Sequence, residues 1–192
     1  MIQILGIAAV VLFYIAYFMK LIGQKRRGIQ TNQLGKGNKG TKTVVIELLL
    51  KIATSIMAVV MFISAVFNTF FFSGLLVRGA GLILLWLGTC LFITAMVTMK
   101  DSWRAGIPEQ DQTAIVTTGI YKVSRNPAFL GFDLTYLGVC LSFGNGIVLT
   151  CTVVTILLMH LQILEEEKFL ERNFHNQYLN YKQKVGRYFL FF

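Results

Sequence analysis

Residues 117 to 131 read Thr-Thr-Gly-Ile-Tyr-Lys-Val-Ser-Arg-Asn-Pro-Ala-Phe-Leu-Gly, and this polar stretch divides an otherwise apolar chain. Asparagine suits the N-cap of a helix, and proline at the first helical position loses no hydrogen bond that the helix needs. The Asn126-Pro127 pair therefore predicts the start of a helix, and Arg125 immediately precedes the N-cap residue. The apolar runs on both sides predict the rest of the fold.

Composition places the chain outside the range of ordinary soluble proteins, because 55% of its 192 residues are hydrophobic and only 14% are charged. The apolar runs cover residues 2–22, 44–67, 79–99, 127–143 and 146–164. The first three are long enough to cross roughly 30 Å of hydrocarbon at about 1.5 Å per residue. The last two flank Gly144-Asn145 and predict a tight helical hairpin. We expect one all-α membrane domain, a bundle of about five transmembrane helices, with an interfacial helix over residues 165–181.

The net charge of +9 would suit a nucleic-acid-binding protein if it lay on a soluble surface. Instead, all Lys and Arg residues except Lys51 and Arg78 fall in segments 20–42 and 100–125 and in the tail from Lys168. Five spans place these three segments on one side, and the positive-inside rule makes that side cytoplasmic. We expect a plasma-membrane protein with its N-terminus outside and its C-terminus inside, partnered by membrane lipids and not by nucleic acid.

Small and sulfur-containing residues within the apolar runs have simple structural interpretations. Gly79-Ala80-Gly81 predicts close packing of one helix on another. Cys90, Cys140 and Cys151 have no paired spacing and no nearby histidine, so we expect no metal site. The first apolar run lacks a preceding basic region and a cleavage site, which favours a retained span over a signal peptide.

Glu47, Lys51 and Asp133 are charged residues inside the predicted spans. Glu47 and Lys51 lie one helical turn apart, where they can pair with each other or extend toward the interface. An acid inside a span usually faces a cavity or a partner. Asp133 therefore predicts either an internal polar contact or a role in a site, and both interpretations stay open.

Glu165, Glu166 and Glu167 are consecutive on a predicted helix, so their side chains point about 100° apart. Glu167 shares a helical face with Phe174 and Tyr178, which predicts that it points inward. We expect Glu166 to be the next most inward and Glu165 to be solvated.

Several short motifs, taken together, are more specific than any one of them. They are Ser102-Trp103-Arg104, Val116 to Tyr121, Ser124-Arg125-Asn126-Pro127, Leu130-Gly131 and Glu166 to Leu170, followed by Phe174, Tyr178, Tyr181 and Val185. This pattern resembles the isoprenylcysteine carboxyl methyltransferase and phospholipid methyltransferase group of integral membrane enzymes. The resemblance marks residues 79–192 as a methyltransferase-like core, whereas residues 1–78 match only in hydropathy.

The resemblance implies that S-adenosylmethionine binds at the cytoplasmic membrane face and that a lipophilic acceptor is methylated. The implied cofactor-binding residues are Gly119, Tyr121, Arg125, Asn126, Pro127, Glu166, Glu167 and Tyr178. The implied catalytic residues are Arg125, Glu167, Arg104 and Asp133. An arginine would orient an acceptor carboxylate, whereas an amine acceptor would need Asp133 or a glutamate as a base.

Two departures from the family pattern bear on the site. Asn126 stands where many relatives have histidine, and asparagine cannot act as a base. The tail also lacks the proline that often follows the final arginine-aromatic segment, so the pattern does not place Arg187.

Two other functions remain as alternatives. Sterol reductases look similar around the loop at Arg125 and use NADPH, and a lipid-binding scaffold without catalytic activity could keep the same fold. The identity of the acceptor, whether carboxylate, amine or another group, stays open at this level.

Overall fold

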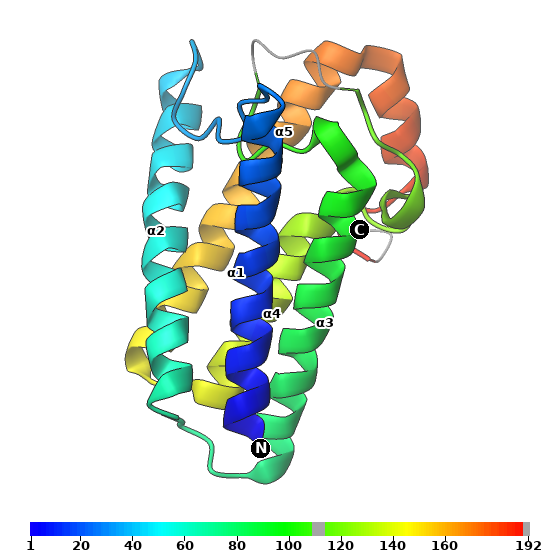
Figure 1. Ribbon diagram of the computed structural model, residues 1–192. Helices are drawn as coiled ribbons and strands as arrows, with labels where there is room; N and C mark the ends of the chain where they lie inside the picture. Colours follow the sequence, from blue (N-terminus) through cyan, green and yellow to red (C-terminus); the bar gives the residue numbers. More distant parts are fainter. Residues whose placement is uncertain (109–113, 190–192) are drawn as a thin grey trace.

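The computed structural model describes residues 1–108 and 114–189. Within these ranges the chain forms an all-α bundle whose helices run alternately up and down (Figure 1). The helices are α1 (Ile2–Arg26), α2 (Thr41–Val66), α3 (Leu75–Met99), α4 (Pro127–Phe143) and α5 (Gly146–Lys184), with short 3-10 helices η1 (Lys100–Ser102) and η2 (Gly119–Lys122). The α1, α2, α3 and α5 segments are long and apolar enough to span a membrane, whereas α4 is shorter, with 17 residues. The chain is an integral membrane protein, as its composition predicts.

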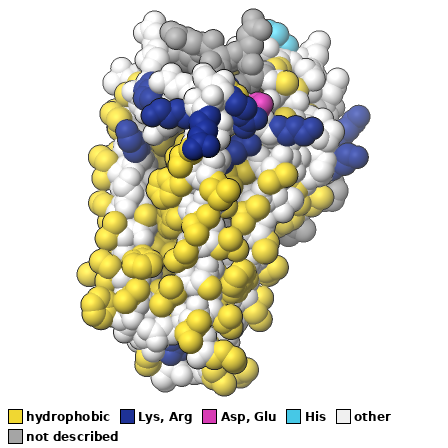
Figure 2. Space-filling view, in the orientation of Figure 1, with side chains coloured by type: hydrophobic (Ala, Val, Ile, Leu, Met, Phe, Trp, Pro, Cys, Tyr) yellow, Lys and Arg dark blue, Asp and Glu magenta, His cyan; other side chains and the backbone are white. Residues whose placement is uncertain are grey.

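The surface separates apolar from basic side chains along the bundle axis. On the face that Figure 2 shows, hydrophobic side chains extend along the bundle, and most Lys and Arg side chains gather toward one end. That end holds the α1–α2 connection and the described parts of the α3–α4 connection (Figure 1). The predicted grouping is therefore confirmed for segment 20–42 and for the described part of segment 100–125.

Glycines allow α3 and α4 to pack with their backbones in contact. A Cβ atom on Gly138 would lie 2.4 Å from the Leu85 nitrogen, and one on Gly131 would lie 2.8 Å from the Phe92 nitrogen. A Cβ on Gly81 would come within 2.8 Å of the Gly138 carbonyl oxygen, which confirms the predicted close packing at Gly81. Any larger residue at these three glycines would force these two helices apart. The same prediction of close packing is wrong for Gly79, where a Cβ would meet nothing within 4 Å.

We call this close contact between α3 and α4 the α3–α4 seam. It changes the expected pairing of α4. Gly144 and Asn145 do join α4 to α5 as a short connection, but α4 packs chiefly against α3, and α5 packs chiefly against α2. The expected tight α4–α5 hairpin is therefore wrong as a packing unit. Backbone contact between glycine-rich faces outweighs proximity in sequence, because it buries more atoms at close range.

The C-terminal polar segment is the continuation of α5. Residues 165–181 do not form a separate helix, because α5 runs unbroken from Gly146 to a sharp bend at His175, whose φ is 39°. Beyond the bend the chain turns back along the bundle (Figure 1). The bend brings the last turns of α5 beside the segment that precedes α4. The interfacial position of this segment stays a prediction.

A buried carboxylate joins the two basic connections. Glu47 of α2 is fully buried and accepts hydrogen bonds from the Lys39 ammonium at 2.7 Å and from the backbone nitrogens of Gly35 (2.7 Å) and Ile107 (3.0 Å). These donors offset the cost of burying the charge. Lys39, and not Lys51, is the partner of Glu47, so the possible pair with Lys51 is not formed. We call Glu47 and its donors the Glu47 cluster.

Candidate active site

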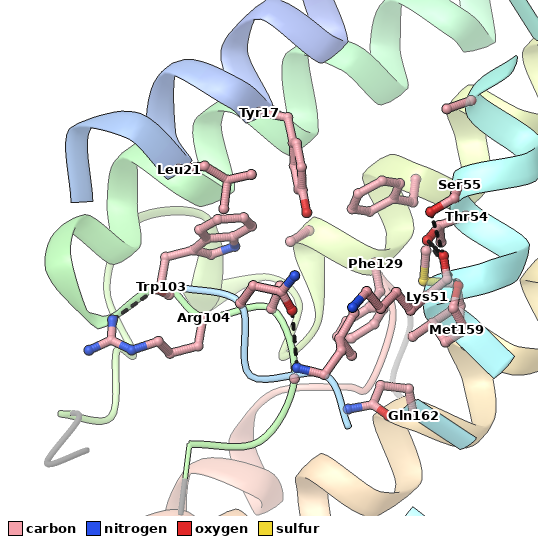
Figure 3. Close-up of a pocket in the computed structure, with 18 of the residues that line it drawn as sticks. Tyr17, Leu21, Lys51, Thr54, Ser55, Trp103, Arg104, Phe129, Met159 and Gln162 are labelled. Atoms are coloured by element: carbon pink, nitrogen blue, oxygen red, sulfur yellow. Dashed lines mark hydrogen bonds between the residues drawn. The ribbon is translucent and has the colours of Figure 1, made fainter. Parts of the chain in front are cut away.

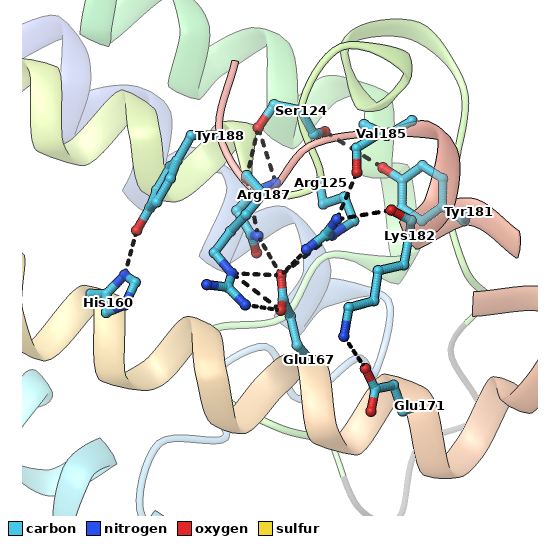
Figure 4. Close-up of polar contacts among 11 residues, drawn as sticks. Ser124, Arg125, His160, Glu167, Glu171, Tyr181, Lys182, Val185, Arg187 and Tyr188 are labelled. Atoms are coloured by element: carbon cyan, nitrogen blue, oxygen red, sulfur yellow. Dashed lines mark hydrogen bonds and ion pairs between the residues drawn. The ribbon is translucent and has the colours of Figure 1, made fainter. Parts of the chain in front are cut away.

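Glu167 is the centre of a polar cluster that joins α5 to the segment before α4. Figure 4 shows Arg125 and Arg187 pointing at its carboxylate from two sides. Arg125 Nη2 lies 2.9 Å from Oε1, Arg187 Nη2 lies 2.8 Å from Oε2, and Asn126 Nδ2 donates to Oε1 at 3.3 Å. The Glu167 side chain is 5% exposed. The prediction that Glu167 points inward is confirmed, and Arg125, Asn126 and Glu167 come together as expected.

Backbone contacts hold the C-terminal segment against the start of α4. The Arg125 backbone nitrogen donates to the Gly186 carbonyl at 3.0 Å, and its guanidinium Nη1 donates to the Val185 carbonyl at 2.6 Å. The Tyr181 hydroxyl donates to the Tyr121 carbonyl at 2.6 Å. Residues 121–126 and 181–187 therefore form one hydrogen-bonded unit.

Asn126 occupies the predicted N-cap position of α4, and Pro127 is at the first turn. Its side chain makes no capping bond, however, because the amide nitrogen donates to Glu167. The backbone carbonyl of Asn126 still accepts the first helical bond, from Leu130 at 3.1 Å. The helix start is confirmed, whereas the side chain of Asn126 belongs to the Glu167 cluster.

Arg187 is the residue of this cluster that the sequence pattern did not place. The Glu167 carboxylate raises the pKa of the Arg187 guanidinium by hydrogen bonding, which keeps that group charged. An arginine followed by aromatic residues was the available signal, but no spacing rule connected it to Glu167. Burial likewise raises the pKa of the Tyr121 phenol, so this hydroxyl stays protonated.

The three glutamates differ from expectation in one respect. Glu165 is not solvated: its side chain is 11% exposed and accepts a hydrogen bond from Thr43 of α2 at 2.9 Å. The close packing of α5 on α2 explains this burial. Glu166 accepts from Gln162 Nε2 at 3.0 Å, and that nitrogen also lies 3.5 Å from Glu47.

A cavity of about 130 Å³, which we call the loop cavity, lies between the segment before α4 and the distal part of α5. Among the predicted cofactor-binding residues, its lining includes Tyr121, Arg125, Asn126, Glu166 and Tyr178. The Tyr178 hydroxyl lies beside Arg125, and it is buried with no hydrogen bond among the described residues. The loop cavity thus offers a carboxylate, aromatic faces and an unused hydroxyl.

A larger cavity of about 320 Å³, the membrane cavity, lies between α1, α2, α4 and α5 (Figure 3). It shares a wall with the loop cavity, formed by Trp103, Arg104, Gly106, Ala128, Phe129 and Glu166. On its other side, Tyr14, Phe18 and Ala58 also line an apolar groove between α1 and α2 on the outer face of the bundle. The two cavities therefore meet at one wall, and the membrane cavity continues toward the lipid-facing surface.

The remaining predicted residues differ in their relation to the cavities. Arg104 lines both, but its guanidinium Nη1 donates to the carbonyls of Asp101 (2.6 Å) and Trp103 (2.9 Å). Gly119 forms the η2 turn with φ +59°, where a Cβ would lie 3.0 Å from Thr98. Asp133 lies further along α4, outside the lining of both cavities, and its Oδ1 is buried without a partner among the described residues.

Sequence reasoning missed several residues that shape the site. Trp103 belongs to a quoted motif and packs at the shared wall, whereas Gln162 and the donors that surround Glu47 carried no recognisable signal as site residues. A glutamate in an otherwise apolar helix was the one available hint at Glu47.

Two comparisons with known proteins bear on the family of the chain. A sequence model of the phospholipid methyltransferase family matches residues 76–177, just over half of the chain. Over 108 residues the chain is 31% identical to Protein-S-isoprenylcysteine O-methyltransferase B of Arabidopsis thaliana, and the alignment covers 55% of each protein. The chain thus spans about half the length of that relative. Because the family model matches more than half of this helical membrane chain, the chain belongs to the phospholipid methyltransferase family.

Proposed function

We propose that the protein transfers a methyl group from S-adenosylmethionine to the carboxylate of a lipophilic acceptor. The observation that carries this proposal is the pair of cavities that share the wall at Trp103, Arg104 and Glu166. A polar donor would enter the loop cavity from the basic end, and an apolar acceptor would enter the membrane cavity sideways between α1 and α2.

The residues of the loop cavity fit the chemistry of such a donor. The Glu166 carboxylate suits an ammonium or ribose hydroxyls, and aromatic side chains such as Phe174 suit stacking on adenine. The unused Tyr178 hydroxyl provides a further hydrogen bond for a ligand. Gly119 and Pro127 would act by shaping the turn and the helix start. We assign residues 79–192 to this methyltransferase core within a single membrane domain.

When bound in the loop cavity, the donor would supply an electrophilic methyl group to the acceptor carboxylate, and the electron pair of the broken carbon–sulfur bond would remain on sulfur. No proton moves in this step, so the chain needs no base, and Asp133 has no role in it. The residues of the shared wall fix the approach of the two reactants, and such alignment can contribute about 7 to 11 kcal/mol. Arg125 and Glu167 act as positioning residues, because they hold residues 182–187 beside the loop cavity.

We further propose that the basic end faces the cytoplasm at the plasma membrane. Lys and Arg side chains collect at that end (Figure 2), and such an excess is typical of cytoplasmic connections. The donor is a water-soluble cytoplasmic metabolite, so this orientation gives it access to the loop cavity.

Calorimetry of the purified protein in detergent with S-adenosylhomocysteine tests the proposed donor site. The parent protein should bind it, and Tyr178→Phe should weaken binding by roughly 2- to 10-fold, the value of one hydrogen bond. Because the Tyr178 hydroxyl has no partner among the described residues, the variant's melting temperature without ligand should match the parent's.

The matched control is Tyr188→Phe, since the Tyr188 hydroxyl contacts His160 and lies outside both cavities. Its affinity for S-adenosylhomocysteine should equal the parent's. Failure of the parent to bind S-adenosylhomocysteine, above all if it binds NADPH instead, would overturn the proposed function.

A further inference from the structure

The membrane cavity contains a cation from the part of the chain that precedes the family match. Lys51 lies one turn along α2 from Glu47, and its side chain extends from α2 into the cavity (Figure 3). Within the part of the chain that the structure describes, no hydrogen bond or ion pair engages its ammonium. Lys51 is exposed, so its ammonium is open to water and to a ligand that enters the cavity.

The other charged residues of the cavity are already engaged. The Arg104 guanidinium donates to backbone carbonyls, and the Glu166 carboxylate accepts from Gln162. The Glu47 carboxylate, one turn away, is held by Lys39. Lys51 therefore gives the cavity a positive charge that the protein itself does not neutralise.

Two further polar groups on the cavity wall await a partner. The Tyr136 hydroxyl and the Gln162 Oε1 atom are buried, and neither has a hydrogen bond among the described residues. Both residues line the same cavity as Lys51 and are fully buried. Unsatisfied buried polar atoms are rare in folded proteins, and they point to a ligand or ordered water at this place.

We propose that Lys51 is a specificity-determining residue, whose ammonium selects a single-chain lipophilic acceptor with a negatively charged head. This inference rests on the proposed function, since it assigns the charge preference of the acceptor in that reaction. An amine acceptor in its protonated form would be repelled by Lys51. The volume of about 320 Å³ suits one chain better than the two chains of a phospholipid.

Paired probes that differ only in charge test this role. The probes are N-acetyl-S-farnesylcysteine, a carboxylate, and its neutral primary amide, each measured by equilibrium binding to the purified full chain without any methyl donor. The parent should bind the acid at least about 10-fold more tightly than the amide, the value of one charge-assisted hydrogen bond. Lys51→Gln should bind both with the parent's affinity for the amide, and Lys51→Arg should keep the preference for the acid.

Lys25→Gln is the matched control, because it removes the same charge from an exposed position of α1 outside the membrane cavity. It should keep the parent's preference for the acid. Equal binding of acid and amide by the parent, or an undiminished preference in Lys51→Gln, would refute the role of Lys51.

A second arm uses vesicles of phosphatidylethanolamine. If the protein bound this lipid in preference to the farnesylated acid, and if that binding depended on Lys51, the acceptor would be a phospholipid. That result would overturn the proposal. Because no donor is present, the result does not depend on the binding of S-adenosylhomocysteine. A failure to bind S-adenosylhomocysteine would contradict the proposed function and not the role of Lys51.

Discussion

At the scale of single residues, charge burial decides how the candidate site is built. Glu167 is surrounded by two guanidinium groups and an amide, so its charge is compensated within the protein. Such a carboxylate has little capacity left for a ligand's ammonium, whereas Glu166 faces both cavities and has one amide donor. We therefore assign donor contact to Glu166 and a positioning role to Glu167.

Glu167→Gln tests this division of roles. The substitution removes both ion pairs and leaves Arg125, whose side chain is 7% exposed, without its counter-charge. Breaking a buried pair typically costs about 3 to 5 kcal/mol, so the melting temperature in detergent should fall by more than about 5 °C. Glu171→Gln, which removes a more exposed pair with Lys182, should change it by less than about 4 °C. Equal melting temperatures for the two variants would contradict the positioning role.

At the scale of helices, the α3–α4 seam holds in place the helix whose start carries part of the candidate site. The seam fixes α4, and the start of α4 carries Arg125 and Asn126 to the Glu167 carboxylate on α5. The α5 helix in turn is anchored to α2, partly through the hydrogen bond between Thr43 and Glu165. The two helix pairs meet at the cavities, so a shift between them would change the shared wall.

Gly138→Ala measures how tightly the seam is packed. An added Cβ would fall 2.4 Å from the Leu85 nitrogen, which forces the helices apart and should cost about 1 to 3 kcal/mol. The melting temperature should fall by several degrees. The control is Gly79→Ala on the partner helix α3: its added Cβ meets nothing within 4 Å, so it should leave stability unchanged or slightly higher. A seam that tolerated the alanine at position 138 would be looser than this structure describes.

At the scale of the whole molecule, charge segregation predicts how the bundle sits in the membrane. The Glu47 cluster draws the α1–α2 connection onto Ile107 of the α3–α4 connection at the basic end. The α2–α3 connection lies at the opposite end (Figure 1). The basic end should therefore face the cytoplasm, where the donor is available.

Cysteine labelling tests that orientation. In a variant with the three native cysteines replaced, Lys36→Cys marks the α1–α2 connection and Ser73→Cys marks the α2–α3 connection. A membrane-impermeant maleimide added to intact cells should label Ser73→Cys at least about 10-fold more than Lys36→Cys, and inside-out vesicles should reverse this ratio. The opposite pattern would place the candidate site outside the cell and rule out access by a cytoplasmic donor.

Local sequence signals predicted much of the molecule because they act over a few residues. Hydropathy located the helices, Asn126-Pro127 marked the start of α4, and Gly81 indicated close packing. Helical periodicity also identified Glu167 as the inward glutamate. Periodicity failed at Glu165, because a neighbouring helix from a distant part of the chain covers a side that the pattern treats as exposed.

The sequence by itself determined that this is a helical membrane protein of the phospholipid methyltransferase family, because hydropathy and short motifs are properties of local composition. Only the tertiary structure decided that Glu167 pairs with both Arg125 and Arg187, that Glu47 pairs with Lys39, and that Lys51 reaches a cavity. These outcomes depend on which helices pack together and on which buried charges find partners. No local pattern encodes that choice, because the free energy of a buried charge is set by groups that are distant in the chain and near in space.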